Sequence, residues 1–73
     1  MTTLYLVDDH PIMRAGLTAL LQAWGHQVLG ESAEPTTALS DLQRLRPQVL
    51  LLDLNLGHRS GYELLGELQR RKL

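Results

Sequence analysis

Short apolar runs alternate along the chain with longer segments in which apolar side chains recur every three or four positions. The clearest runs are residues 3–7 (TLYLV) and 48–52 (QVLLL), and a weaker one is residues 26–31 (HQVLGE). Short runs rich in apolar and β-prone residues predict strands, and the first run is expected to be buried on both faces of its sheet. Gly30 weakens the prediction for residues 26–31, because a glycine has no side chain to pack within a strand.

Three segments with helical spacing fill the intervals between the runs. The first begins at Pro11, where a missing N–H costs little, and ends at Gly25. The second lies between Pro35 and Pro47, and the third begins at Ser60 in a capping box, Ser-Gly-Tyr-Glu. The apolar stripes of the three predicted helices are Met13, Leu17, Leu20, Leu21 and Trp24; Ala38, Leu39, Leu42 and Leu45; and Tyr62, Leu65 and Leu68.

The resulting order is strand, helix, strand, helix, strand, helix, with residues 54–59 (LNLGHR) predicted as a loop before the last helix. Strands that alternate with helices indicate an α/β fold with a parallel sheet and right-handed crossovers. In such sheets a ligand site lies beyond the carboxyl ends of the strands, where the strand order reverses. With the order 2-1-3, the first and third strands are neighbours and the reversal lies between them.

Composition narrows the classes of function. The chain has 73 residues, enough for one small domain, and it has no cysteine for disulfides or thiolate metal sites. Its formal net charge of −1 gives no basic surface typical of nucleic-acid binding, and the basic run at residues 70–72 is interpreted as a solvated helix end. No signal peptide and no apolar stretch of membrane-spanning length is visible, so we expect a cytoplasmic protein without membrane contact.

Acidic residues follow two of the predicted strands. Asp8 and Asp9 come directly after residues 3–7, and Asp53 comes directly after residues 48–52. Three carboxylates that converge repel one another, and a divalent cation such as Mg²⁺ removes the conflict because it prefers oxygen ligands. A carboxylate beside such a cation can attack phosphorus and form an acyl phosphate. For Asp8 or Asp9 a helix cap is the simpler alternative, whereas Asp53 begins no helix.

Four other side chains receive structural interpretations. His10 is interpreted as an exposed histidine at the helix start, with a supporting position behind the acidic site as the alternative. His58 has no histidine or cysteine beside it and is assigned to the loop. Trp24 is expected in the core or in an interface, and Tyr5 is expected to form a hydrogen bond at the rim of its buried strand.

Two stretches, LVDDHPIMRAGL and VLLLDLNLGHRSGYELL, carry a family resemblance. The chain resembles the N-terminal part of a response-regulator receiver domain of the NarL/FixJ type, which has a flavodoxin-like fold. The resemblance implies that a histidine kinase phosphorylates Asp53 and that Asp9 and Asp53 bind Mg²⁺, with Asp8 acting through a water and the Asn55 backbone carbonyl as a further ligand. It also implies a signalling protein rather than an enzyme, one that controls transcription through a C-terminal helix-turn-helix output domain that binds DNA.

The chain departs from that family in its acceptor loop and in its length. The family usually has a proline and a glycine after the acceptor, whereas this chain has the sequence GHRS before Gly61, which should make the loop more mobile. A receiver has five βα units, so we expect residues 1–73 to form a partial receiver that lacks the last two units and carries no output domain. Lys72 does not match the family's lysine that contacts the phosphoryl group.

A three-unit sheet would leave its third strand at an edge. A long apolar edge strand tends to pair with another chain, so we expect two copies to associate or to exchange an element. Two other functions stay open at this point. The second candidate is a dimerisation or binding module that is not phosphorylated, since the family's lysine and switch hydroxyl are absent. The third is a phosphohydrolase with an aspartate nucleophile, which Asn55 disfavours because such enzymes place a second acid there.

Overall fold

The computed structural model describes residues 1–53, 55–56 and 59–71, with residues 55, 56, 59 and 60 described at the level of the backbone. Three parallel strands form the main sheet: β1 (Thr3–Val7), β2 (Gln27–Ser32) and β3 (Val49–Leu52). Their order is β2-β1-β3, which confirms the predicted order 2-1-3. The helices are α1 (Pro11–Ala23), α2 (Pro35–Leu45) and α3 (Gly61–Arg71), so the three βα units lie where the sequence predicts them.

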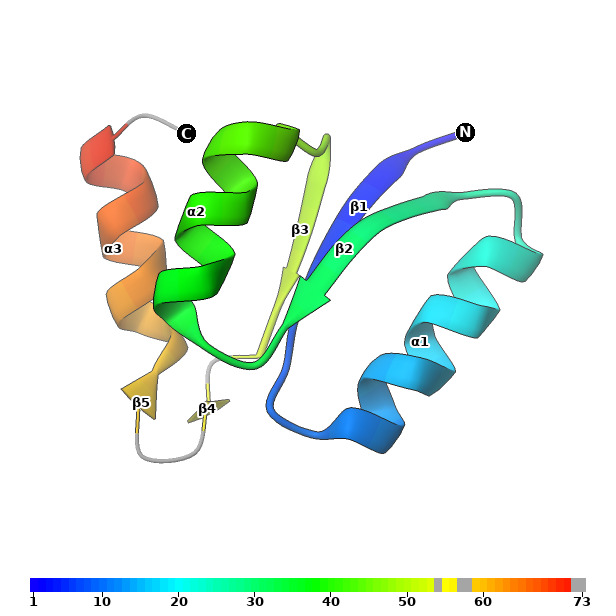
Figure 1. Ribbon diagram of the computed structural model, residues 1–73, viewed down its shortest axis with the longest axis horizontal. Coiled ribbons are helices and arrows are strands. Elements are labelled where there is room, and N and C mark those ends of the chain that lie inside the picture. The colour runs from blue at the N-terminus through cyan, green and yellow to red at the C-terminus, as the bar shows by residue number, and fades with distance from the viewer. Residues whose placement is uncertain (54, 57–58, 72–73) are drawn as a thin grey trace.

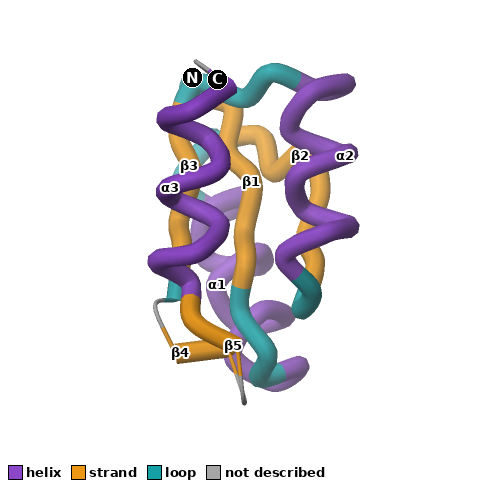
Figure 2. The backbone as a smooth tube through the Cα atoms, turned by 90° about the vertical axis from the view of Figure 1, so that its left-hand side faces the viewer, coloured by secondary structure: helices purple, strands orange, loops and turns teal. Residues whose placement is uncertain are grey.

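The helices cover both faces of the sheet. In Figure 1 and Figure 2, α1 lies on one side of the sheet, and α2 and α3 lie side by side on the other. Strand β1 runs through the middle, and residues 4–7 are all buried, as predicted for a strand covered on both faces. Within the described part of the chain, no helix is long and apolar enough to cross a membrane.

The main core lies between the sheet and the α2–α3 pair. Tyr5 and Val7 alternate on that face of β1, and they pack with apolar side chains of both helices. Partly buried side chains of β3 extend the cluster. The helical members are Ala38, Leu42, Leu64 and Leu68, and the partly buried ones are Leu39, Leu45, Leu50 and Leu52. The predicted stripe of α2 is therefore confirmed as its packing face.

Tyr5 joins this core to α2 through a polar contact. Its hydroxyl donates a hydrogen bond of 2.6 Å to Oδ2 of Asp41, and Arg44 donates one of 3.1 Å to the other oxygen of the same carboxylate. The Tyr5 side chain is fully buried, so its hydroxyl is satisfied inside the protein, as predicted from the sequence. Burial, and next the hydrogen bond to Asp41, raise the pKa of Tyr5 to about 12.

Gly30 is the residue that makes room for the Tyr5 ring. Tyr5 pairs with Gly30 across the β1–β2 ladder, next to a register shift between Leu4 and Tyr5. A Cβ atom at Gly30 would lie 3.0 Å from Cε2 and 3.4 Å from Cδ2 of Tyr5. The glycine that weakens the strand prediction is therefore required by the aromatic ring that packs against it.

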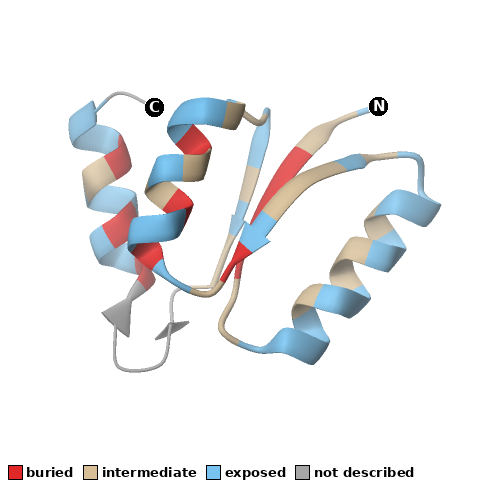
Figure 3. Ribbon diagram, viewed as in Figure 1, coloured by how far each residue is buried: buried red, intermediate tan, exposed pale blue. Residues whose placement is uncertain are grey.

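Helix α1 is less buried than its apolar stripe predicts. It has no buried residue, and Figure 3 shows only exposed and intermediate positions along it. Met13 and Leu20 are exposed, and Trp24 is 65% exposed, although their spacing predicts a buried stripe. Polar contacts join the helix to β2 instead, because Glu31 accepts hydrogen bonds from Arg14 (3.2 Å) and Thr18 (2.9 Å).

The segment from Asn55 to α3 also differs from its prediction. Residues 54–59 were predicted as a loop, but two short antiparallel strands, β4 (Asn55–Leu56) and β5 (Arg59–Ser60), pair within it. Two-residue strands carry too little pattern for the sequence to reveal them. The loop positions of Gly57 and His58, the capping side chain of Ser60 and the position of Lys72 lie outside what the structure describes.

Helix α3 packs against α2 through a stripe that shares only Leu68 with the predicted one. Its buried residues are Gly61, Leu64 and Leu68, whereas Tyr62 is 63% exposed and Leu65 is 39% exposed. Both stripes have helical spacing, so the pattern alone does not choose between them. At the end of α3, Arg70 and then Arg71 donate hydrogen bonds to Glu67 and lower the pKa of that carboxyl to about 2.

We expect Tyr5→Phe to lower the free energy of unfolding by about 1–2 kcal/mol, because the 2.6 Å hydrogen bond to Asp41 is lost while the ring stays in place. Urea denaturation measures the change. Since the pKa of Tyr5 is raised, the stability from the neutral hydroxyl is present below about pH 10 and is lost between about pH 10 and 12. A double variant with Asp41→Ala should lose less than the two single losses combined. Additive losses would show that the two groups are not coupled.

We expect Gly30→Ala to destabilise the fold by about 1–3 kcal/mol, because the new methyl group would overlap a Tyr5 ring that its own hydroxyl holds in place. Thermal unfolding followed by circular dichroism measures the loss. Gly16→Ala in α1 is the matched control, since nothing lies within 4 Å of its Cβ position and alanine favours a helix. Equal effects of the two substitutions would contradict the close packing of Tyr5 on Gly30.

Candidate functional site

Backbone pairing at the carboxyl ends of the strands brings the acidic residues together. Val7 is paired with Leu52 in the parallel ladder of β1 and β3, and the Asp53 N–H donates to the Val7 carbonyl at 2.8 Å. On the other side, the Asp8 N–H donates to the Ser32 carbonyl at 3.1 Å. The first residue beyond each strand is thus held next to its neighbour, as the sheet order predicts.

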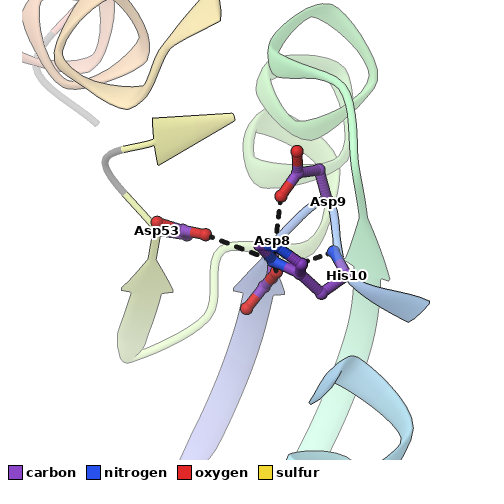
Figure 4. Close-up of side chains that lie close together, drawn as sticks. All are labelled: Asp8, Asp9, His10 and Asp53. Atoms are coloured by element: carbon purple, nitrogen blue, oxygen red, sulfur yellow. Dashed lines mark hydrogen bonds and ion pairs between the residues drawn. The ribbon is translucent and has the colours of Figure 1, made fainter. Parts of the chain in front are cut away.

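The close-up in Figure 4 shows Asp8, Asp9, His10 and Asp53 gathered at this edge of the sheet. Each offers one ligand atom, and these four atoms lie within 4.8 Å of one another. The three carboxylates are partly buried, with side chains that are 15%, 27% and 28% exposed in chain order. The structure therefore confirms the prediction that the side chains of Asp8, Asp9 and Asp53 lie close together.

His10 lies inside this cluster rather than beside it. Its Nδ1 atom is 2.8 Å from Oδ1 of Asp8, 3.0 Å from Oδ1 of Asp9 and 3.7 Å from Oδ2 of Asp53. The ring is 67% exposed, so the interpretation as an exposed histidine at the helix start is correct for its accessibility but misses its position in the site. The only sequence signal for that position is its place directly after two aspartates.

The pKa values of Asp8 and His10 reflect their contact. The hydrogen bond to Asp8 and then the charge of Asp9 raise the pKa of His10 above its ordinary value. Burial alone would raise the pKa of Asp8, but hydrogen bonds from the His10 backbone and ring outweigh it and lower that pKa. Both shifts favour the ionised carboxylate beside a protonated imidazole.

The helix-cap alternative for the two adjacent aspartates does not fit the structure. The N-cap residue of α1 is His10, and no side chain donates or accepts a cap hydrogen bond there. Oδ1 of Asp8 accepts a hydrogen bond of 2.8 Å from the His10 N–H, which lies before the helix. Both carboxylates are thereby left to face the site rather than the first turn of α1.

Arg14 supports the site from α1, and the sequence analysis did not single it out. Its Nη1 donates a hydrogen bond of 2.6 Å to the Asp8 backbone carbonyl, while its Nε bonds Glu31 of β2. The side chain is only 18% exposed. Arg14 therefore fixes the backbone of the β1–α1 connection, which carries Asp8 and Asp9.

The cluster has the composition expected of a site for a hard divalent cation. Three carboxylates supply oxygen ligands, and the buried Oδ1 of Asp9 forms an ion pair with His10 but no hydrogen bond within the described residues. A cation would satisfy that oxygen and relieve the repulsion among the three charges. Asn55, for which a carbonyl ligand is predicted, lies two residues beyond Asp53 in β4, and its contribution stays a prediction.

Comparison with known proteins identifies the family of the chain. A family model for the response regulator receiver domain matches residues 4–73. The nitrate/nitrite response regulator protein NarP of Escherichia coli K12 is 41% identical over 66 residues, which cover 89% of this chain and 31% of NarP. NarL of the same organism is 35% identical over 72 residues, covering 97% of this chain and 33% of NarL.

Solved structures agree with these relatives in fold. The crystal structure of a two-component response regulator of the LuxR family from Aurantimonas sp. SI85-9A1 superposes with a TM-score of 0.88 at 29% identity, covering 97% of this chain and 51% of that one. The chain spans about a third of the length of the curated relatives named above. The strand order, the acidic cluster and the family match lead to one conclusion: this chain belongs to the response regulator receiver domains, among relatives of the NarL type.

Proposed function

We propose that this chain is the phosphoacceptor segment of a two-component response regulator and that Asp53 takes a phosphoryl group from a histidine kinase. The observation that carries the proposal is the position of Asp53, at the carboxyl end of β3 and within 4.8 Å of two other carboxylates and His10. A carboxylate in that position is 28% exposed, which leaves it open to a phosphodonor.

The transfer needs one bond to form and one to break. An oxygen of Asp53 attacks the phosphorus, and the phosphorus–nitrogen bond of the donor's phosphohistidine breaks as its imidazole leaves. Asp8, Asp9, Asp53 and the Asn55 carbonyl are the residues that would hold Mg²⁺. The bound ion would neutralise the negative charge on the transferring group. The backbone hydrogen bonds of Asp8 and Asp53 keep the carboxylates in place during the transfer.

The relatives suggest the wider role. NarP and NarL are named as response regulators for nitrate and nitrite, and DevR/DosR of Mycobacterium tuberculosis, 38% identical over 72 residues, is named as a DNA-binding transcriptional activator. We extend the proposal to a cytoplasmic protein that controls transcription, with DNA binding by a domain outside this chain. Phosphorylation of Asp53 would then shift a two-state equilibrium that the output domain reads.

We expect wild-type protein incubated with acetyl phosphate and Mg²⁺ to gain the mass of one phosphoryl group, and Asp53→Asn to gain none. Intact-mass spectrometry at low temperature measures the modification. Glu63→Gln is the matched control, because it removes an exposed carboxylate of α3 outside the cluster and should still be modified. A phosphoryl group retained by Asp53→Asn would contradict the assignment, and an unmodified wild type would favour a binding module instead.

We also propose that copies of this chain associate through β3. In the described sheet β3 is an edge strand, and its Val49 and Leu51 side chains are each 38% exposed. An apolar edge strand offers unpaired backbone groups together with a hydrophobic surface, a combination that favours pairing with another strand.

We expect light scattering at micromolar concentration to show a dimer or larger species, and Val49→Lys to shift the protein toward a monomer, since a charge on an edge strand opposes pairing. Ile12→Lys is the control, because Ile12 is 89% exposed at the start of α1 and takes no part in the sheet. A compact wild-type monomer at that concentration would contradict association.

A further inference from the structure

We propose that Glu31 of β2 is a positioning residue for the candidate site, and that it acts on the backbone of Asp8 through Arg14. The inference rests on the proposed function, because it concerns the site that would hold Mg²⁺ during phosphoryl transfer. Glu31 lies on an edge strand of the sheet and is not one of the clustered residues. Its effect on the site is therefore indirect.

The backbone of Asp8 is held on both sides of the residue. Its N–H donates a hydrogen bond of 3.1 Å to the Ser32 carbonyl, and its own carbonyl accepts one of 2.6 Å from Nη1 of Arg14. The second bond has a charged donor, which makes it stronger than a bond between neutral groups. Because that carbonyl belongs to the peptide group between Asp8 and Asp9, Arg14 orients the segment that carries two of the three clustered carboxylates.

Glu31 in turn orients Arg14. Its Oε1 accepts a hydrogen bond of 3.2 Å from Nε of Arg14, and its Oε2 accepts one of 2.9 Å from the Thr18 hydroxyl. A free arginine side chain has many rotamers, and a partner that selects one of them reduces the entropy lost when the guanidinium binds a second group. The Arg14 side chain is 18% exposed and that of Glu31 is 38% exposed, so the ion pair is partly shielded from water.

Apolar packing gives α1 little alternative support. The helix has no buried residue, and its N-cap makes no side-chain hydrogen bond. Polar contacts with Glu31 therefore contribute more to its position than they would for a helix with a buried stripe. Since Asp8 and Asp9 lie in the connection from β1 to α1, a shift of the helix also moves their backbone.

A merely structural role, in which Glu31 only joins α1 to β2, makes a different prediction. The Thr18 hydroxyl also joins α1 to Glu31, and within the described residues it forms no bond with Asp8. Thr18→Val should therefore remove part of the connection between helix and strand while leaving the bond from Arg14 to the Asp8 carbonyl. A positioning role predicts that the two connections have unequal effects on the site.

We expect Glu31→Ala to weaken Mg²⁺ binding by about tenfold, as measured by titration calorimetry, because the support of a ligand-bearing segment is lost. Thr18→Val is the matched control and should bind Mg²⁺ like the wild type. Glu31→Gln keeps an acceptor oxygen and removes the charge, so its affinity should lie closer to the wild type than to Glu31→Ala. In a background of Arg14→Ala, Glu31→Ala should have little further effect, since the two residues act in series.

A second measurement needs no metal. Amide hydrogen exchange followed by nuclear magnetic resonance should be faster at Asp8 in Glu31→Ala than in the wild type, whereas Leu6 of the same strand should be unchanged. A general loss of stability would instead speed exchange at both positions. Faster exchange at Asp8 alone therefore identifies a local effect on the segment that carries the carboxylates.

Four results would overturn the inference. Equal losses of affinity in Glu31→Ala and Thr18→Val would show that Glu31 only joins helix to strand, and additive losses with Arg14→Ala would show that it does not act through Arg14. Faster exchange at Asp8 and Leu6 alike would indicate general destabilisation. Wild-type affinity in Glu31→Ala would remove its role while leaving the proposed function intact, whereas a wild type that binds no Mg²⁺ would overturn the cation site of that function as well.

Discussion

Parallel pairing of β1 with β3 is the constraint on which the rest of this structure depends. The ladder pairs Val7 with Leu52, and one further backbone hydrogen bond places Asp53 beside the end of β1. At the opposite ends of the two strands, Gln48 accepts from the Thr3 N–H at 2.9 Å and its own N–H donates to the Thr3 hydroxyl at 3.0 Å. Register is thereby fixed at both ends, and backbone hydrogen bonds hold Asp8 and Asp53 close together in addition to the contacts of their carboxylates with His10.

The two faces of the sheet use different means to hold their helices. On the face of α2 and α3, apolar side chains pack around Tyr5 and Val7, and the Tyr5 hydroxyl adds a hydrogen bond to α2. On the other face, α1 has no buried residue and is joined to β2 by the contacts of Arg14 and Thr18 with Glu31. Arg14 also holds the Asp8 carbonyl, so the less buried helix is the one connected to the site.

The spacing of apolar residues predicted the three βα units. The alternation of strands and helices indicated a parallel sheet with the order 2-1-3, and that order brings the aspartates at the strand ends together. Apolar spacing failed for α1 and for two of the three predicted positions of α3, because the same helical spacing fits more than one stripe and the neighbouring elements decide which stripe is buried. Asp8 and Asp53 could be foreseen because each directly follows a strand. The position of His10 depends on the backbone angles before Pro11, and that of Arg14 on a turn geometry, neither of which leaves a periodic pattern.

Asp8 and Asp53 directly follow the last paired residues of their strands, and their N–H groups donate to the carbonyls of Ser32 and Val7 in those last pairs. The carboxyl end of the ladder therefore sets the geometry of the site, while the side chains of the same strands form the core. A single residue inserted between Val7 and Asp8 would keep every core side chain. It would move Asp8 and Asp9 one position further from the end of β1 relative to β3. Such a change would separate the carboxylates without removing a core side chain, so an intact hydrophobic core does not by itself guarantee an intact site.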